Sequence, residues 1–170
     1  MRIDCGVCTL RPFDPADAAA ITPLLNDRDV WLNLSDRIPY PYLLEHGEEF
    51  VRVARAKTPP VNFAICVDGR VVGSIGIVPG EGISRVSAEV GYWLGKPYWR
   101  RGIATAALKS ITPYAVEHFD LTRVFANVFA HNSGSIRILE KAGYVREGSM
   151  KHSSIKDGVI QDEYLYAWYA

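Results

Sequence analysis

Residues Glu89–Leu108 read EVGYWLGKPYWRRGIATAAL. The first part alternates apolar residues with others, as a strand does, at Val90, Tyr92 and Leu94. From Gly102 onward the apolar residues recur at the spacing of one helical face, at Ile103, Ala107, Ile111 and Ala115. The stretch therefore predicts a strand, a short basic turn and the start of a helix.

The basic turn has the features of an anion site. Gly102, at the mouth of the expected helix, lets a ligand approach the backbone, where the first helical N–H groups have no partner in the helix. These groups, the positive end of the helix dipole, and the side chains of Arg100 and Arg101 favour an anion such as a diphosphate. An ordinary strand-to-helix turn with solvated arginines fits the same pattern. Neither the Walker spacing nor the dinucleotide Gly-x-Gly-x-x-Gly spacing is present.

Two motifs resemble one enzyme family. Trp99–Ala104 is similar to the acyl-CoA pyrophosphate loop of the GNAT N-acetyltransferases, Gln/Arg-x-x-Gly-x-Gly/Ala. Trp99 departs from the first position, as it does in the branch that acetylates ribosomal-protein N-termini (Rim-type). Asn132–Tyr144 resembles the family's Asn-x-x-Ser-x-x-x-x-Glu-Lys-x-Gly-Phe segment. Both motifs stand in the family's order and spacing, so the resemblance covers the whole chain and is greatest to the Rim-type branch.

The rest of the pattern predicts one α/β domain over residues 1–170. Asp68-Gly69 and Asp157-Gly158 each join two apolar runs and predict hairpins. The strand–helix–strand unit from Val86 to Ala130 predicts a right-handed parallel crossover. Together with the resemblance, this predicts a GNAT-like mixed, mostly antiparallel sheet of roughly six to seven strands. Its central parallel strands are splayed, and about four helices flank it.

Three local features give further expectations. Asp14 and the proline after it predict a capped helix that runs toward Leu25. A second helix is expected over residues 43–57, with Glu48 pairing with Arg52 on its solvated face. Gly91, in the middle of a strand, predicts a bulge or a close backbone approach.

Charge and hydropathy limit the function classes. The formal net charge is zero and the pI is about 6.9, so nothing indicates broad attraction to nucleic acid or to a membrane surface. No apolar run is long enough to span a bilayer, and the amino terminus lacks a signal pattern. The expected compartment is the cytoplasm, and the expected state is a monomer or a homodimer.

Cys5-Gly-Val-Cys8 is a C-x-x-C pattern, which is typical of a redox pair or of half a zinc site. The other half of a zinc site is absent, because only Cys66 remains and no histidine pair has ligand spacing. We therefore expect no metal. The pattern favours two ordinary residues of the first strand.

The resemblance implies acetyl-CoA as co-substrate. The coenzyme diphosphate would lie on the loop residues Arg100, Arg101, Gly102, Ile103, Ala104 and Thr105. Its pantetheine arm would pair with the strand backbone at Trp93, Leu94 and Gly95, where one N–H would stabilise the thioester oxyanion. Asn132 would cap the following helix and pair with the pantetheine amides.

Acetyl transfer needs a neutral amine and a proton for the departing thiolate. Glu89, on the central strand, resembles the family's carboxylate base, although a structural carboxylate fits the same position. Ser135 matches the Rim-type serine near the sulfur, whereas the tyrosine acid of other members is replaced by Leu139. The Rim-type partner carboxylate also has no match, because Ser154 stands at that spacing.

The acceptor side is less defined by the sequence. Residues 30–42 are rich in aromatics and proline, and they form either a loop tucked onto the core or a wall of the acceptor pocket, as in the related family. Trp31, Tyr40 and Tyr92 are the candidate acceptor-binding residues, with core packing as the alternative. His131 and His152 are further possible bases or ordinary surface residues.

The expected function is therefore transfer of an acetyl group from acetyl-CoA to a primary amine, by direct attack in a ternary complex. The Rim-type resemblance points to a protein N-terminal amine. Two alternatives stay open. One is a small-amine acceptor such as a polyamine, an amino acid or an antibiotic, and the other is a non-catalytic acyl-CoA-binding or sensor module.

Overall fold

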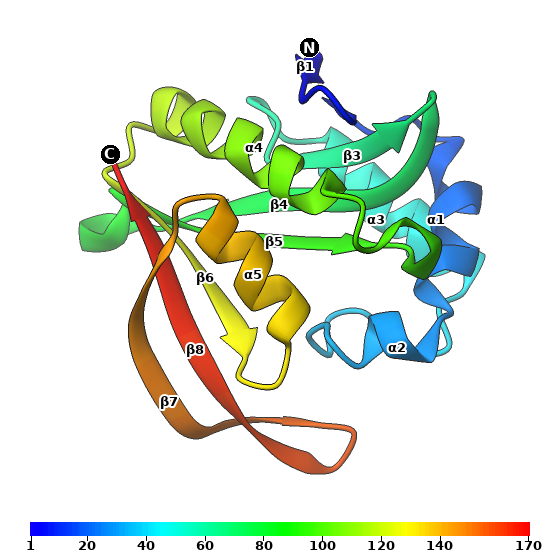
Figure 1. Ribbon diagram of the computed structural model, residues 1–170. Helices are drawn as coiled ribbons and strands as arrows, with labels where there is room; N and C mark the ends of the chain where they lie inside the picture. The colour runs from blue at the N-terminus through cyan, green and yellow to red at the C-terminus, as the bar shows by residue number, and fades with distance from the viewer.

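The computed structural model describes residues 1–170 and contains one eight-stranded sheet, in the order β1-β2-β3-β4-β5-β6-β8-β7 (Figure 1). The strands are β1 Ile3–Asp4, β2 Thr9–Arg11, β3 Asn62–Val67, β4 Arg70–Pro79, β5 Ser87–Leu94, β6 Arg123–Phe129, β7 Val145–Lys156 and β8 Val159–Tyr169. The helices are α1 Asp17–Leu25, α2 Arg28–Trp31, α3 Leu44–Arg55, α4 Ile103–Phe119 and α5 Ser133–Lys141. Short 3-10 turns lie at Gly82–Ser84 and Lys96–Tyr98. The expected α/β class and mixed sheet are confirmed.

The central strands β5 and β6 are parallel and soon separate. Their ladder ends at the pair Glu89–Phe125, and only two pairs precede it. Beyond that point β5 continues along β4 as far as the pair Gly73–Leu94, whereas β6 continues along β8 as far as Phe129–Glu163. This separation confirms the expected splay and leaves a V-shaped opening between the two strands.

Two apolar cores cover the two faces of the sheet. The larger one joins α4 and α5 to the sheet, and it buries the predicted helical face completely, at Ile103, Ala107, Ile111 and Ala115. The smaller one packs α1 and α3 on the opposite face, around Trp93 of β5. Figure 1 shows α4 and α5 in front of the sheet and α1 and α3 behind it. The opening between β5 and β6 is therefore bounded by different helices on its two sides.

The structure has one strand and one helix more than expected. The extra strand is β1, which has only two residues and shows no apolar alternation. The extra helix is α2, which falls in the segment expected to be a loop. Its start is fixed by the Asp27 carboxylate, which accepts hydrogen bonds from the N–H groups of Asp29 and Val30. A single turn is too short to show a helical period.

One side-chain expectation is confirmed and one is wrong. The Asp14 Oδ1 accepts the Ala16 N–H at 3.0 Å at the entry of the first helix. The helix α1 itself begins at Asp17, whose buried carboxylate accepts the Asp14 N–H and binds the Arg11 guanidinium at 2.7 and 2.9 Å. This bidentate pair holds the start of α1 against β2. In α3, Arg52 binds Glu49 at 2.6 and 2.7 Å and not the expected Glu48.

The C-x-x-C pattern does not lie within a strand. Cys5 and Cys8 flank the two-residue turn between β1 and β2, since the strands end at Asp4 and begin again at Thr9. The turn uses Gly6, whose φ of +79° is favourable only for glycine. The expectation of two ordinary strand residues is therefore wrong.

Gly91 produces no bulge, because the β4–β5 register runs unbroken through it and an added Cβ would meet nothing within 4 Å. The close backbone approach belongs instead to Gly73 of β4. A Cβ on Gly73 would lie 2.2 Å from the Trp93 carbonyl oxygen. Only glycine at this position lets β4 pair with the end of β5, which is the strand that borders the opening.

We predict that Gly73→Ala lowers the free energy of unfolding by at least about 2 kcal/mol, because the new methyl group overlaps a backbone oxygen that cannot move alone. The matched variant is Gly91→Ala, also in mid-strand. It should leave that free energy unchanged or raise it by up to about 1 kcal/mol. Urea denaturation followed by circular dichroism measures both. Equal stability of the two variants would contradict the close approach at Gly73.

Candidate active site

The main chain of β5 determines what faces the opening. The Gly95 N–H donates to the Val72 carbonyl on the β4 side, at 2.8 Å, and Trp93, two residues earlier, points the same way. The Leu94 carbonyl points the other way and accepts from Trp99 Nε1 at 2.8 Å. Of the three predicted strand contacts, only Leu94 offers main-chain groups to the opening. The main-chain groups of Trp93 and Gly95 thus point toward β4, whereas those of Tyr92, which alternates with Leu94, point toward the opening; contact of any of them with a pantetheine arm stays a prediction.

Trp99, the residue that departs from the family pattern, is half-exposed and ties the loop to the strand through its indole N–H. The loop then passes through two left-handed residues, Arg100 at φ +60° and Gly102 at φ +77°. Gly102 is the N-cap of α4, and no side chain caps the helix. A Cβ on Gly102 would meet nothing within 4 Å. The first N–H groups of α4 therefore point into open space, as an anion site requires.

The other predicted loop residues fall into two groups. The side chains of Ile103 and Ala104 are buried in the core, so these two residues can contribute only backbone N–H groups. Arg100 and Arg101 are exposed, and the Arg101 guanidinium lies 5.6 Å from the centre of the Tyr98 ring. Thr105 is half-buried on the first turn of α4. The structure thus gathers the predicted loop residues around one helix end.

Two hydroxyl groups meet between β5 and α5. The Tyr92 hydroxyl lies 2.8 Å from Ser135 Oγ. Asn132 holds Ser135 in place, because its Oδ1 accepts the Ser135 N–H at 3.1 Å as the cap of α5. Burial raises the pKa of Tyr92 well above its usual range, so the phenol stays protonated at neutral pH. Tyr92, which was expected to contact the acceptor, therefore also belongs with Ser135.

Glu89 lies where the parallel ladder ends, paired with Val78 on one side and Phe125 on the other. It shares a strand face with Trp93, which packs against α1 and α3. Glu89 therefore lies on the sheet face that α1 and α3 cover, which the sequence alone could not determine. Glu89 is half-buried and takes part in none of the six ion pairs. The carboxylate thus stands at the base of the opening without a fixed cationic partner.

Trp31 and Tyr40, both predicted on the acceptor side, stack on each other with ring centres 5.0 Å apart. Lys156 of β7 fixes this wall, because its Nζ lies 3.8 Å from the centre of the Trp31 ring and 3.1 Å from Asp36 Oδ1. The Lys156 side chain is only 3% exposed. The loop after α2 is therefore fastened to the β7–β8 hairpin.

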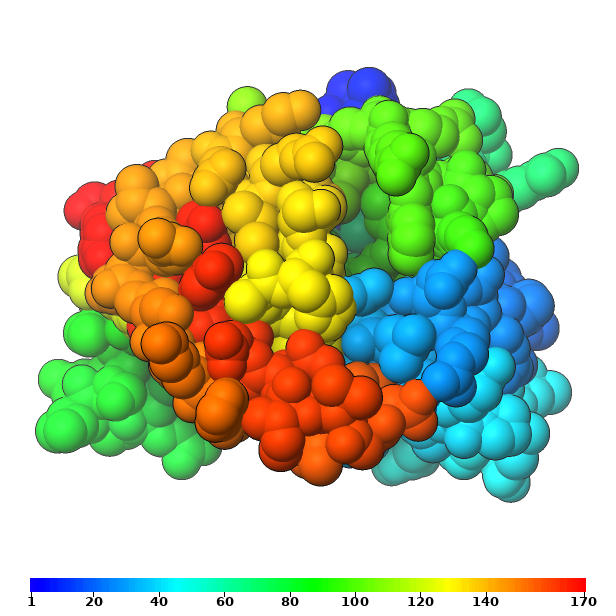
Figure 2. Space-filling view, turned by 60° about the horizontal axis from the view of Figure 1, so that its bottom comes forward, coloured from blue at the N-terminus to red at the C-terminus, as the bar shows by residue number.

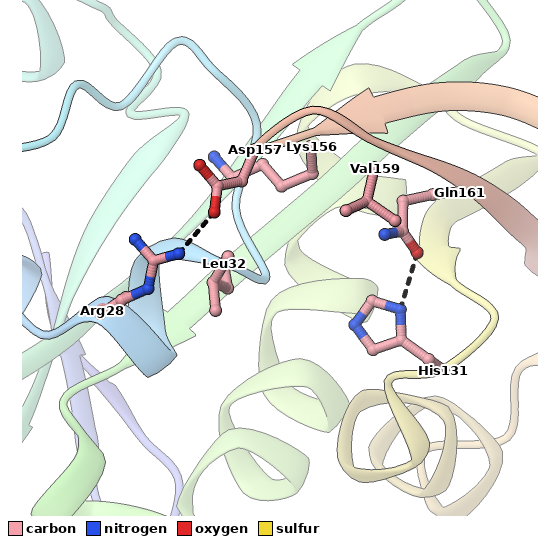
Figure 3. Close-up of a pocket in the computed structure, with 7 residues that line it drawn as sticks. All are labelled: Arg28, Leu32, His131, Lys156, Asp157, Val159 and Gln161. Carbon is pink, nitrogen blue, oxygen red and sulfur yellow. Dashed lines mark hydrogen bonds and ion pairs between the residues drawn. The ribbon is translucent and has the colours of Figure 1, made fainter.

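A hollow of about 470 Å³ lies between α2, the β7–β8 hairpin and the end of β6 (Figure 3). It is lined by Arg28, Leu32, His131, Lys156, Asp157, Val159 and Gln161. Arg28 forms an ion pair with Asp157, and His131 Nδ1 lies 2.9 Å from Gln161 Oε1. Donation from Nδ1 leaves the other ring nitrogen of His131 able to accept a proton. Figure 2 shows the surface hollowed where the yellow α5, the green loop before α4 and the blue α2 region meet.

Ser154 has the one buried side-chain oxygen or nitrogen without a hydrogen-bond partner, its Oγ. It lies opposite Gln161 in the β7–β8 ladder, and Gln161 lines the hollow. In the sequence, Ser154 stood out only because it occupies the position of the Rim-type carboxylate. The Oγ is itself buried and Ser154 is not one of the residues that line the hollow, so this hydroxyl lies within the wall.

Other kinds of site find less support. No group of three or more His, Cys, Asp or Glu side chains is placed to hold a metal ion. His152 does not line the hollow, and its backbone N–H donates to Asp162 Oδ1. No helix has both the length and the apolar character needed to cross a bilayer.

Comparisons with known proteins agree with this geometry. The model of the acetyltransferase (GNAT) domain matches residues 8–145. The putative ribosomal N-acetyltransferase YdaF of Bacillus subtilis is 29% identical over 94% of this chain and 89% of that protein. The probable N-acetyltransferase YjcK of the same organism is 33% identical, but the match spans only 59% of this chain and 55% of that protein.

Among solved structures, RimJ of Mycobacterium smegmatis in complex with CoA-disulfide is 27% identical. The match covers 100% of this chain and 88% of that one, with a TM-score of 0.85. The family model spans most of the sequence, and Rim-type proteins are among the relatives in both sequence and structure. The chain belongs to the GNAT acetyltransferases, as the two motifs indicated.

Proposed function

We propose that this protein transfers an acetyl group from acetyl-CoA to the N-terminal amine of a protein, by direct attack in a ternary complex. The observation that carries the proposal is the separation of β5 from β6 after Glu89. It leaves the main chain of Leu94 facing an opening whose rim is the uncapped end of α4. Two relatives support the same function, because YdaF is named a putative ribosomal N-acetyltransferase and RimJ was solved in complex with CoA-disulfide.

The coenzyme fits the groups that the structure leaves free. Its diphosphate binds the first N–H groups of α4, with Arg100 and Arg101 adding charge from outside. Its pantetheine amides pair with the main chain of Tyr92 and Leu94, as an added strand does. The Leu94 N–H, which β4 does not use, then faces the thioester oxygen and stabilises the oxyanion that develops there.

We predict that Gly102→Glu weakens CoA binding at least about 100-fold, because the new carboxylate enters the space of the diphosphate. The matched control is Gly69→Glu in the β3–β4 hairpin. Gly69 has the same φ of +77° and the same open surroundings, so both variants carry the same backbone strain. Calorimetric titration with CoA measures both. A dissociation constant for Gly102→Glu within twofold of the control would remove the loop from the coenzyme site.

Two proton transfers are assigned to separate faces of β5. Glu89, on the α1–α3 face, removes the proton of the amine directly or through water. The pair Tyr92–Ser135, on the α4–α5 face, forms hydrogen bonds to the thiolate that leaves and relays a proton to it from solvent water. Burial raises the pKa of Tyr92 far above the thiol pKa of about 8.5, so the phenol stays neutral and acts as a hydrogen-bond donor, not as the source of that proton.

We predict that Glu89→Gln lowers kcat about 10²- to 10⁴-fold and removes the enzyme's part of the acid-side decline in the pH–rate profile. Both proteins are assayed with the same amine, so ionisation of the amine affects them equally. His131→Gln is the comparison variant and should keep the wild-type profile. The opposite result, a normal profile for Glu89→Gln and a lost acid limb for His131→Gln, would make His131 the base.

The acceptor enters through the hollow between α2 and the β7–β8 hairpin. Its volume of about 470 Å³ suits the first residues of a peptide chain. The lining residue Lys156 contacts the Trp31 ring, which stacks on Tyr40, so this stacked pair supports the wall of the hollow. The lining residues Leu32 and Val159 offer apolar contact. The cations Arg28 and Lys156 are already paired with Asp157 and Asp36. Asp157, the acidic side chain that lines the hollow, is thus neutralised by Arg28, and the hollow has no free negative charge for a multiply charged small amine.

We predict that peptides with free N-termini are acetylated with a kcat/KM at least about tenfold above that of polyamines, free amino acids or aminoglycosides. A peptide makes contacts along the hollow that a small amine cannot make. Thiol release from acetyl-CoA measures every acceptor, and N-terminally blocked peptides serve as the control. A higher kcat/KM for a small amine than for any peptide would contradict the proposed protein N-terminal acceptor. Coenzyme binding without turnover on any amine would indicate a sensor module.

A further inference from the structure

Cys5 and Cys8 face each other across the turn between β1 and β2. The ladder pairs Ile3 with Leu10 and Asp4 with Thr9, and the same register, continued past the strand ends, sets Cys5 opposite Cys8. The Cys5 N–H donates to the Cys8 carbonyl at 2.9 Å, as this register requires. The two residues therefore form a directly opposed pair at the closed end of a hairpin.

This geometry suits a disulfide bond. Directly opposed residues of antiparallel strands have Cα atoms roughly 4.5–5.5 Å apart, within the range of about 4.4–6.8 Å that disulfides need. All three cysteines are free thiols in the structure. The backbone thus already holds Cys5 and Cys8 where a bond can form without rearrangement of the sheet.

The two thiols differ in exposure and in acidity. Cys5 is half-buried, whereas Cys8 is 5% exposed. A hydrogen bond from the Cys8 thiol lowers the pKa of Cys5 to about 7, helped by Ser110 and opposed by burial. The same interaction and burial raise the pKa of Cys8. Cys5 is therefore the attacking thiolate, and Cys8 is the thiol that resolves the product.

Cys5 also lines a hollow of about 340 Å³ beside the start of α4. The hollow is lined too by Gly102, Thr105 and two exposed lysines, Lys109 and Lys141. The lysines and the uncapped helix end give this hollow a positive potential. An anionic disulfide such as glutathione disulfide is attracted to it, and that brings the reagent to Cys5.

We propose that Cys5 and Cys8 form a thiol–disulfide exchange site for small anionic disulfides. The Cys5 thiolate attacks one sulfur of the disulfide, forms a mixed disulfide and releases the first small thiolate. Cys8 then loses its proton and attacks the Cys5 sulfur, so the second thiolate leaves. Two protein thiols and one small disulfide become one protein disulfide and two small thiols, which carry away the two protons.

Oxidation acts on the coenzyme loop, a consequence that rests on the proposed function. Cys8 Sγ lies 3.8 Å from the carbonyl oxygen of Ile103, the first residue of α4. In the reduced protein the one Cys8 S–H is shared between this carbonyl and the Cys5 sulfur, so a bond to Cys5 removes the donor and draws the Cys8 sulfur toward the turn. We expect the dissociation constant of CoA to rise at least about threefold in the oxidised protein. An unchanged dissociation constant would overturn this coupling alone.

The exchange site is tested on the whole chain without coenzyme, so the result does not depend on acetyl transfer. The protein is incubated with glutathione disulfide and analysed by intact and peptide mass spectrometry. The wild type should lose two hydrogens, keep no glutathione and yield a Cys5–Cys8 link that dithiothreitol reverses. Cys8→Ser and Cys8→Ala should each retain one glutathionyl group on Cys5. Cys66→Ser, the control, should behave as the wild type.

Three results would overturn the proposal. One is a wild-type protein that does not react, and another is a mixed disulfide on Cys5 that persists although Cys8 is present. The third is oxidation that maps to Cys66. The Cys5→Ser variant tests whether Cys5 reacts first, because Cys8 should then carry no glutathionyl group. Circular dichroism of each variant establishes that the measured protein is folded.

Discussion

The site depends on the end of one hydrogen-bonded ladder. After Glu89, β5 and β6 no longer pair, so the main-chain groups of Leu94 and Tyr92 have no strand to bind on that side. Unpaired backbone groups inside a sheet are costly unless a ligand or water satisfies them. An extended amide chain, such as the arm of the proposed coenzyme, would satisfy these groups. Gly73 supports it from behind, since only glycine there lets β4 hold the end of β5.

The two sides of the opening are built by different means. On the proposed coenzyme side the groups available to a ligand are backbone N–H donors, positioned by the left-handed Gly102 and by the Trp99 anchor to Leu94. On the acceptor side they are side chains brought together by tertiary contacts, with Lys156 held between Trp31 and Asp36. A backbone cradle suits a coenzyme that every family member shares. A side-chain wall can change between members and can therefore set the acceptor.

The sequence predicted those parts of the site that depend on local backbone requirements. Three local features were recognisable from neighbouring residues. Gly102 indicated the loop, the alternation through Leu94 indicated the strand, and the cap at Asn132 indicated the helix that follows it. It could not predict which of Trp93 and Leu94 turns its main chain outward, because alternation fixes the period and not its phase. It also missed Lys156 against Asp36, since contacts 120 residues apart leave no local pattern.

The replacement of the family's tyrosine acid by Leu139 has a structural counterpart. Leu139 is fully buried in the core under α5, so that position cannot supply a proton. The hydroxyl pair of Tyr92 and Ser135 lies on the same helix's side of β5, with 2.8 Å between the oxygens. Burial raises the pKa of the Tyr92 phenol, which therefore stays a neutral hydrogen-bond donor, and the Asn132 cap fixes the Ser135 backbone beside it. In the proposed mechanism this hydroxyl pair contacts the leaving sulfur from the strand, at the place where other family members use a tyrosine of the helix.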